Sequence, residues 1–157
     1  MSYRVSGPVN VLFDEKDIGL LKEGVIIRPR FEWEPIIVDY YGRVPIDFIN
    51  TGVSAAVECI GVDPSAIATA NPWIKDLFAF GNKVGALASA EFSKSLKIQE
   101  RDGQLWIASN AFLAGMADIP LLATRELAIP LTFIVLPDED DKLWATLPSY
   151  FDSNVGG

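Results

Sequence analysis

The sequence predicts a mainly β fold of the α+β kind: an antiparallel β-sandwich or barrel with a flanking α-helix and a long projecting β-hairpin. Segments with alternating apolar residues, bounded by glycine-containing turns, fill the first third of the chain, whereas helix signals are confined to its middle. The 157 residues, half of them hydrophobic, suffice for one core and contain no repeat or long linker. We therefore expect a single domain over residues 1–157.

The first predicted elements are strands of successive antiparallel hairpins. One strand carries apolar side chains at alternate positions, namely Val9, Val11 and Phe13. A turn at residues 14–16 follows it, and a second strand over residues 18–21 is closed by a turn at residues 22–24.

The next segment has two different faces if it is extended. Its charged side chains point one way (Arg28, Arg30, Glu32, Glu34), and its prolines and aromatic residues point the other way (Pro29, Phe31, Trp33, Pro35). Because proline cannot donate a ladder hydrogen bond, we place Pro29 and Pro35 at an edge, a bulge or a loop tip. The predicted projecting hairpin then has arms at residues 25–27 and 36–40. In one interpretation, the charged face is solvated and the aromatic face packs on the core. In the other, the segment is an interaction surface.

Two turns and a strand follow this segment. Residues 41–43 and residues 51–52 contain glycine and predict turns on either side of residues 44–49. The strand that we predict from Val53 to Ile60 contains Cys59, which we expect to be a small buried hydrophobic residue.

Helix signals lie in the middle of the chain. Asp63-Pro64-Ser65 can start a short helical turn, and Asn71-Pro72 followed by WIKDLFAFG predicts a short amphipathic helix that ends at Gly81 and packs on the sheet.

The last predicted elements are again strands. Residues 95–100 and 104–108 flank the turn Arg101-Asp102-Gly103, which predicts a hairpin. Residues 128–136 predict a central strand, in which Pro130 has to lie at a bulge or an unpaired position.

Composition limits the possible functions. The chain has no histidine and a single cysteine, so it cannot build a Ser-His-Asp or Cys-His device, a usual zinc site or an internal disulfide. Its net charge of −8 disfavours sequence-specific nucleic-acid binding. It shows neither a membrane-spanning segment nor a signal peptide, so we expect synthesis in the cytosol.

Two acidic features and the tryptophans could in principle form a site. Residues 138–141 lack the spacing of a calcium loop and predict a solvated turn. Glu32 and Glu34 are neighbours on one strand, so they cannot form opposite walls of a glycosidase cleft. Core packing is favoured over sugar stacking for the tryptophans, which are Trp33, Trp73, Trp106 and Trp144. We expect no catalytic, cofactor or metal site and no enzymatic activity.

The order and spacing of several elements resemble the major tail tube protein of tailed bacteriophages. The matching positions are Asp17-Ile18-Gly19, Gly24-Val25, Val38-Asp39, Gly42, Pro45, Asp47 and Gly52, together with the closing strand ELAIPLTFIVLPD. This resemblance implies a virion protein, made in the host cytoplasm, that forms hexameric rings. The rings stack into a tube through which double-stranded DNA passes without specific binding, and the tube contacts tape measure, terminator and distal tail proteins.

The resemblance and the two-faced segment together give the candidate site residues. We expect inter-subunit contacts from the segment's strand residues, which are Val25, Arg28, Arg30, Phe31, Glu32, Trp33, Glu34, Ile36 and Val38. We expect acids to face the lumen, where they repel phosphates, and the candidates are Glu32, Glu34 and Asp39. The alternatives are another tail ring protein such as a tail terminator, a monomeric carbohydrate-binding β-sandwich and, remotely, a carboxylate enzyme.

Overall fold

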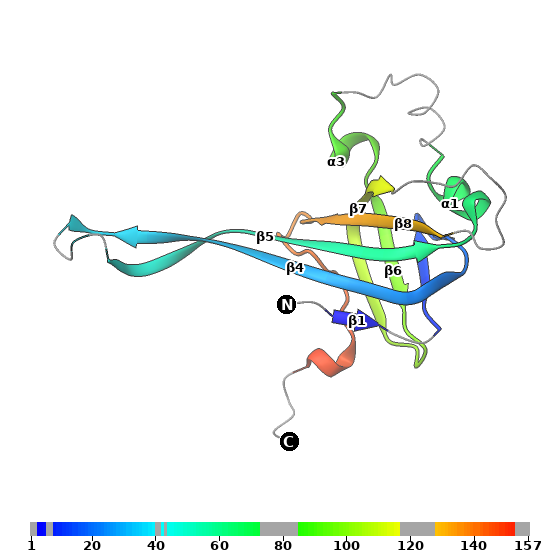
Figure 1. Ribbon diagram of the computed structural model, residues 1–157, viewed down its shortest axis with the longest axis horizontal. Coiled ribbons are helices and arrows are strands. Elements are labelled where there is room, and N and C mark those ends of the chain that lie inside the picture. The colour runs from blue at the N-terminus through cyan, green and yellow to red at the C-terminus, as the bar shows by residue number, and fades with distance from the viewer. Residues whose placement is uncertain are drawn as a thin grey trace.

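The structure, a computed structural model, describes residues 3–5, 8–39, 42, 44–72, 85–116 and 128–152. Within these residues an eight-stranded antiparallel sheet has the order β1-β4-β5-β8-β7-β6-β2-β3 (Figure 1). The strands are β1 (Tyr3–Val5), β2 (Asn10–Phe13), β3 (Lys16–Asp17), β4 (Leu21–Ile37), β5 (Pro45–Gly61), β6 (Lys94–Gln99), β7 (Leu105–Met116) and β8 (Ile129–Leu136). The helices are α1 (Pro64–Ala70), α3 (Ala88–Glu91) and the 3-10 helix η2 (Ser149–Phe151). The predicted mainly β, antiparallel fold with a flanking helix is confirmed.

The sheet curls around one hydrophobic core. Phe13 of β2 and Phe133 of β8 have ring centroids 5.4 Å apart, although β7 and β6 lie between these strands in the sheet. The rings of Tyr3 in β1 and Trp106 in β7 likewise lie close, with centroids 6.2 Å apart. Side chains from all strands but β3 line the core, so one curled sheet supplies both of its walls.

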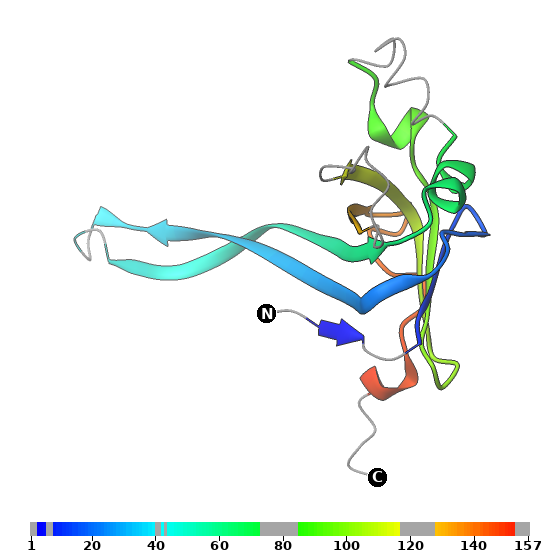
Figure 2. The same cartoon turned by 45° about the vertical axis from the view of Figure 1, so that its right-hand side comes forward.

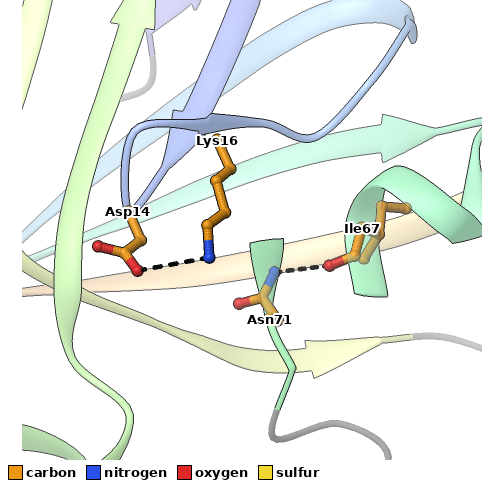
Figure 3. A network of polar contacts seen from close by, with 4 residues as sticks. All are labelled: Asp14, Lys16, Ile67 and Asn71. Atoms are coloured by element: carbon orange, nitrogen blue, oxygen red, sulfur yellow. Dashed lines mark hydrogen bonds and ion pairs between the residues drawn. The ribbon is translucent and has the colours of Figure 1, made fainter. Parts of the chain in front are cut away.

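The β2–β3 hairpin has the predicted turn. Asp14 and Glu15 have positive φ angles of 54° and 62°, as the two central residues of a type I′ turn require. Asp14 also forms a 4.0 Å ion pair with Lys16 (Figure 3). The prediction of a strand over residues 18–21 is wrong, because Leu21 alone of these four residues belongs to a strand. Ile18 is nevertheless fully buried in the core.

The predicted turn at residues 22–24 is a β-bulge within β4. Glu23 and Gly24 adopt positive φ angles of 61° and 76°, and the register shifts between Lys22 and Val25. The strand resumes with the pair Val25–Cys59, so β4 continues where we expected a chain reversal. A bulge absorbs the extra residues as a local kink and adds twist.

The projecting hairpin is confirmed, but it is longer than we predicted and turns elsewhere. β4 runs unbroken to Ile37 and pairs with β5 up to the pair Ile37–Pro45, so the two strands of the hairpin are antiparallel over its whole described length (Figures 1 and 2). Pro29 and Pro35 therefore lie inside a strand and not at a tip. Proline is tolerated there because, in the described chain, β1 pairs with β4 only at residues 25–27 and leaves the edge beyond them unpaired.

Gly52 lies within β5, so the turn predicted at residues 51–52 is wrong. A register shift occurs there instead, between the pairs Glu32–Gly52 and Trp33–Asn50. A Cβ at this position would approach Glu32 Oε2 to 3.3 Å, so the exposed Glu32 side chain would have to shift slightly. Residues 51–52 thus add twist to the hairpin without reversing it.

Helix α1 begins where Asp63-Pro64-Ser65 predicted a helical turn. Asp63 accepts hydrogen bonds from the Ser65 and Ala66 backbone N–H groups and caps the helix. Asn71 ends it by donating Nδ2 to the Ile67 carbonyl at 3.1 Å (Figure 3). The helix predicted after Asn71, up to Gly81, lies outside the described residues beyond Pro72. No helix in the described ranges is long and apolar enough to cross a membrane.

The remaining strands lie where they were predicted, but β7 runs to Met116, beyond the expected end at residue 108. β6 and β7 form a hairpin whose turn ends at Gly103, with φ of 88°. β8 is central, between β5 and β7. Pro130 was expected at a bulge or an unpaired position, but it pairs with Ile60 of β5, and only its β7 side lies beyond the last described pair, Met116–Leu131. The chain then crosses β7, where Thr146 bridges Ile107.

Cys59 is a buried hydrophobic residue of β5, as predicted, and burial raises the pKa of its thiol to about 12. An exposed thiol in the unfolded chain titrates at about 8.5–9. The folded state therefore keeps a proton that the unfolded state loses, and stability falls as pH rises through this window.

We predict that the wild type loses about 1.4–2 kcal/mol more stability between pH 7 and pH 10 than Cys59→Ala, which has no thiol to ionise. Urea unfolding at a series of pH values measures the difference, and all other titrating groups cancel between the two proteins. Equal losses in both proteins would contradict the buried, protonated thiol.

Candidate assembly surface

The projecting hairpin is the candidate functional surface. We call its part beyond the body the arm, which consists of residues 28–37 of β4, residues 45–54 of β5 and the described residues of the connection between them. β5 is held on both sides only from Ala55 to Gly61, where β8 pairs with it. The arm is therefore a two-stranded ribbon in the described chain, and it leaves the body as a twisted pair (Figure 2).

One side of the arm, the apolar face, continues the core face of the sheet. Its β4 residues are Pro29, Phe31, Trp33, Pro35 and Ile37, and residues opposite them on β5 include Val53 and Phe48. Two and four positions before Pro29, on the same side of β4, Ile27 and Val25 are buried. Because side chains alternate along a strand, one side of β4 presents apolar residues both in the core and on the exposed arm.

The apolar face is exposed to an unusual degree for such residues. Phe31, Trp33 and Phe48 are 54%, 58% and 56% exposed, and Ile37 and Val53 are close to half exposed. Monomeric soluble proteins rarely present a contiguous apolar patch of this kind, and such patches mark interaction sites.

The opposite side, the charged face, separates its charges along the arm. Arg28 and Arg30 lie near the body, whereas Glu32, Glu34 and then Asp47 lie toward the tip. Arg28 Nε donates to Glu58 Oε2 at 2.9 Å, and Arg30 Nη2 lies 3.4 Å from Glu32 Oε1. These groups are exposed, so the pairs contribute little to stability and stay available to a partner.

The structure brings most of the predicted site residues together. The two predicted faces of the segment are confirmed by the register, and Arg28 to Ile36 all lie on the arm, with Val38 and Asp39 at its tip. Val25 is different, because it does not lie on the arm and its side chain is 0% exposed in this chain's own core. The inter-subunit and lumen roles of the other residues stay predictions.

Sequence reasoning missed the β5 half of the surface. Exposed apolar residues there are Val44, Ile46, Phe48, Ile49 and Val53. A signal was present, because this segment is apolar and lies between two glycine turns. Its position beside Phe31 and Trp33 depends on the hairpin's true turn, which the predicted tip had placed elsewhere.

Other clusters on the body have ordinary structural explanations. The predicted turn at residues 138–141 exists, with Asp138 Oδ1 accepting from the N–H groups of Asp140 and Lys142. Among the described residues no three cysteine, aspartate or glutamate side chains gather as a metal site. A cleft of about 310 Å³ lies at the base of β4, where Arg4 and Lys22 balance Glu23 and Glu58.

Trp106 is 3% exposed and packs against Trp144 and Phe151, each with a centroid distance of 5.2 Å. It therefore serves the core, as predicted. Trp33 is exposed on the arm, and Trp73 lies outside the described residues.

Comparisons with known proteins give remote likenesses only. No protein-family model matches the chain, and no curated protein matches it. A chain in the tail of an empty gene transfer agent particle with C6 symmetry is 12% identical, with a TM-score of 0.49 over 76% of this chain and 79% of that one. A chain in the virion of a native gene transfer agent particle is 14% identical, with a TM-score of 0.46 over 80% and 88% of the two chains.

Proposed function

We propose that this protein is a structural subunit of a phage-type tail that needs no cofactor and polymerises, as stacked hexameric rings, into the tube that conducts DNA. The subunit is made in the host cytoplasm and acts in the virion, where the tape measure, terminator and distal tail proteins are its other partners. It has no enzymatic role. We infer the kind of assembly from the sequence resemblance. The arm gives the physical reason why copies of the chain would associate.

The observation that carries the proposal is the exposed apolar face of the arm. Burying one large apolar side chain contributes about 1.5–3 kcal/mol, and the face presents Phe31, Trp33, Ile37, Phe48 and Val53 side by side. A second copy that covers this face removes these apolar side chains from water, which stabilises the contact between the two chains. Because every copy carries the same arm, the contact repeats through the whole assembly.

The edges of the arm support the same conclusion. A strand edge with free backbone groups has to be capped or used, and closing subunits into a ring removes such edges. In the described chain both sides of the arm lack a neighbouring strand. A subunit of this shape is incomplete alone and is completed by its neighbours.

The carbohydrate-binding alternative fits the arm less well. Small-molecule sites are concave and bury most of their ligand. Trp33 instead projects from a two-stranded ribbon, and Trp106 is buried in the core. A tail terminator would use similar contacts but would stop at a single ring, so the length of the assembly distinguishes it from a tube protein.

The first prediction from the proposed function concerns the apolar face. The double variant Trp33→Ser/Phe48→Ser should abolish tubes and rings, because it removes two large side chains from the contact but none from the core. Negative-stain microscopy and native mass spectrometry of the purified chain measure this. Leu87→Ser, which alters a residue 72% exposed on the body, is the control and should assemble normally. Monomeric wild-type protein under all assembly conditions would contradict the proposed function.

Our second prediction concerns the charged face. Glu32→Lys/Glu34→Lys should impair assembly while the monomer stays folded, since exposed charge changes usually alter stability by only about 0.5 kcal/mol. Glu139→Lys/Asp140→Lys makes the same charge change in the exposed turn after β8 and is the matched control. Normal tubes at wild-type yield from the arm variant would show that these carboxylates lie outside the contacts.

Our third prediction concerns the channel. The assembled lumen should carry a net negative potential, because the chain has 21 acidic and 13 basic residues and a DNA conduit works best without adhesive sites. Glu32, Glu34 and Asp39 are the expected contributors. A structure of the tube tests this. A lumen lined mainly by Lys and Arg, or one narrower than the roughly 20 Å of a B-form duplex, would be inconsistent with a conduit.

A further inference from the structure

We propose that the C-terminal segment fixes the direction in which the arm leaves the body, and that Glu100 and Phe151 are the positioning residues through which it acts. We call residues 143–152 the clasp. Its role in assembly rests on the proposed function, in which neighbouring copies meet through the arm. Its effect on the arm is a property of the free chain and can be measured there.

The clasp crosses the body and is bound to it at two places. In its first half, the Ile107 N–H of β7 donates to the Thr146 carbonyl at 3.0 Å, and the Thr146 N–H donates to the Ile107 carbonyl at 3.2 Å. In its second half, Gln104 Oε1 accepts from the Ser149 N–H at 2.8 Å and from the Ser149 hydroxyl at 3.1 Å. Both halves of the clasp are therefore fixed to β7 and to the turn before it.

Glu100 holds the end of the clasp. Its Oε2 accepts from the Tyr150 hydroxyl at 2.7 Å and from Trp106 Nε1 at 3.2 Å. Hydrogen bonds to an ionised acceptor are about twice as strong as those between neutral groups. Partial burial and then the Glu100 carboxylate raise the pKa of Tyr150 to about 12, so its hydroxyl remains a donor at neutral pH. One carboxylate thus ties the clasp to the β6–β7 hairpin.

Phe151 extends this attachment to the other end of the chain. Its ring centroid lies 5.2 Å from that of Trp106 and 5.6 Å from that of Tyr3 in β1, with interplanar angles of 80° and 73°. Edge-to-face ring pairs of this kind are favourable beyond the area that they bury. The helix η2, which contains Phe151, lies beside β1 below the root of the arm (Figures 1 and 2). The clasp therefore holds β1 against the body.

β1 supports the arm where the arm begins. Tyr3 pairs with Ile27, and the arm starts at the next residue of β4. At the far end of β1, Val5 is anchored in the core with 6% exposure, whereas Tyr3 is 37% exposed and has the rings of Trp106 and Phe151 beside it. The end of β1 next to the arm therefore depends on the clasp for its position.

The length of the arm amplifies any change at its root. Residues 28–37 span roughly 30 Å at the rise of a β-strand. A rotation of about 10° at the root then moves the tip by roughly 5 Å, which exceeds the separation of about 4 Å at which apolar side chains touch. A small displacement of β1 is thus enough to misplace the apolar face.

Phe151→Ala and Glu100→Ala test the clasp at two points. One matched control is Leu147→Ala, which removes an apolar side chain of the clasp that is 45% exposed and lies outside the ring contacts. The other is Glu139→Ala, which removes a carboxylate from the exposed turn after β8. Thermal melting checks that each variant is folded. If Phe151→Ala unfolds, Phe151→Leu, which keeps an apolar side chain but loses the ring, takes its place.

The direction of the arm is measured in the monomer by pulsed electron paramagnetic resonance. Spin labels are attached at Asp47→Cys on the arm and Lys94→Cys on β6, in a Cys59→Ala background. The clasp variants should broaden the distance distribution or shift its mean by roughly 5 Å, the displacement that a small rotation at the root produces. Both controls should match the wild type. Glu100→Gln, which keeps an acceptor oxygen, should lie between Glu100→Ala and the wild type.

Two further readouts follow the same variants. Hydrogen exchange of residues 3–5 should accelerate about tenfold in both clasp variants, as expected for the loss of an aromatic pair or of a hydrogen bond to a charged group. The protein concentration needed for assembly should rise in the same variants and stay unchanged in both controls.

The outcomes separate the clasp from the proposed function. Unchanged distances in both clasp variants would overturn the proposal, without bearing on whether the chain forms a tube. A loss of assembly with unchanged distances would also overturn it, because Glu100 and Phe151 would then be direct contacts between chains. A wild type that never assembles would overturn the proposed function, while the distances would still decide whether the clasp directs the arm.

Discussion

The period of two along a β-strand is the constraint on which this molecule depends. In β4 it places Val25 and Ile27 on the same side as Phe31 and Trp33. The first pair is covered by the curled sheet, and the second pair lies beyond it and is exposed. One pattern thus builds both the core and the candidate assembly surface. The core residues differ from the surface residues in that the rest of the sheet covers them.

The arm is the least self-sufficient part of the fold. A two-stranded hairpin without a third strand or a packing layer is marginally stable in water. Here the ribbon is anchored where β5 is held between β4 and β8, and it loses that support beyond Ala55. Completion of the arm's structure and assembly of the chain are therefore coupled: the partner that covers the apolar face also stabilises the ribbon that presents it.

How far the sequence predicted this arrangement depends on the range of the interactions. Local signals worked: the type I′ turn at Asp14 and Glu15, the cap at Asp63 and the turn at Gly103 all depend on neighbouring residues. The two faces of residues 28–35 were also predictable, because alternation is local. The extent of the hairpin was not predictable, because Pro29 and Pro35 suit a loop tip and an unpaired strand edge equally well. Which of the two applies depends on the edge strand β1, whose described residues pair with three residues of β4.

The same reasoning explains the errors at the candidate site. Val25 belongs to the alternating segment, but its burial depends on strands distant in sequence. Phe48 and Val53 were overlooked because their position opposite β4 follows from the register, which shifts at three places along the two strands. Sequence therefore predicted the chemistry of the surface better than its boundaries.

The most direct test of the central claim is hydrogen–deuterium exchange of the chain before and after assembly. If neighbouring copies cover the arm, backbone amides of residues 45–54 should exchange rapidly in the monomer and gain strong protection in the assembled form. Amides of the body strands β6 and β7 should be protected in both. Arm amides that exchange equally fast in monomer and assembly would contradict the account, because the arm would then lie outside the contacts between chains.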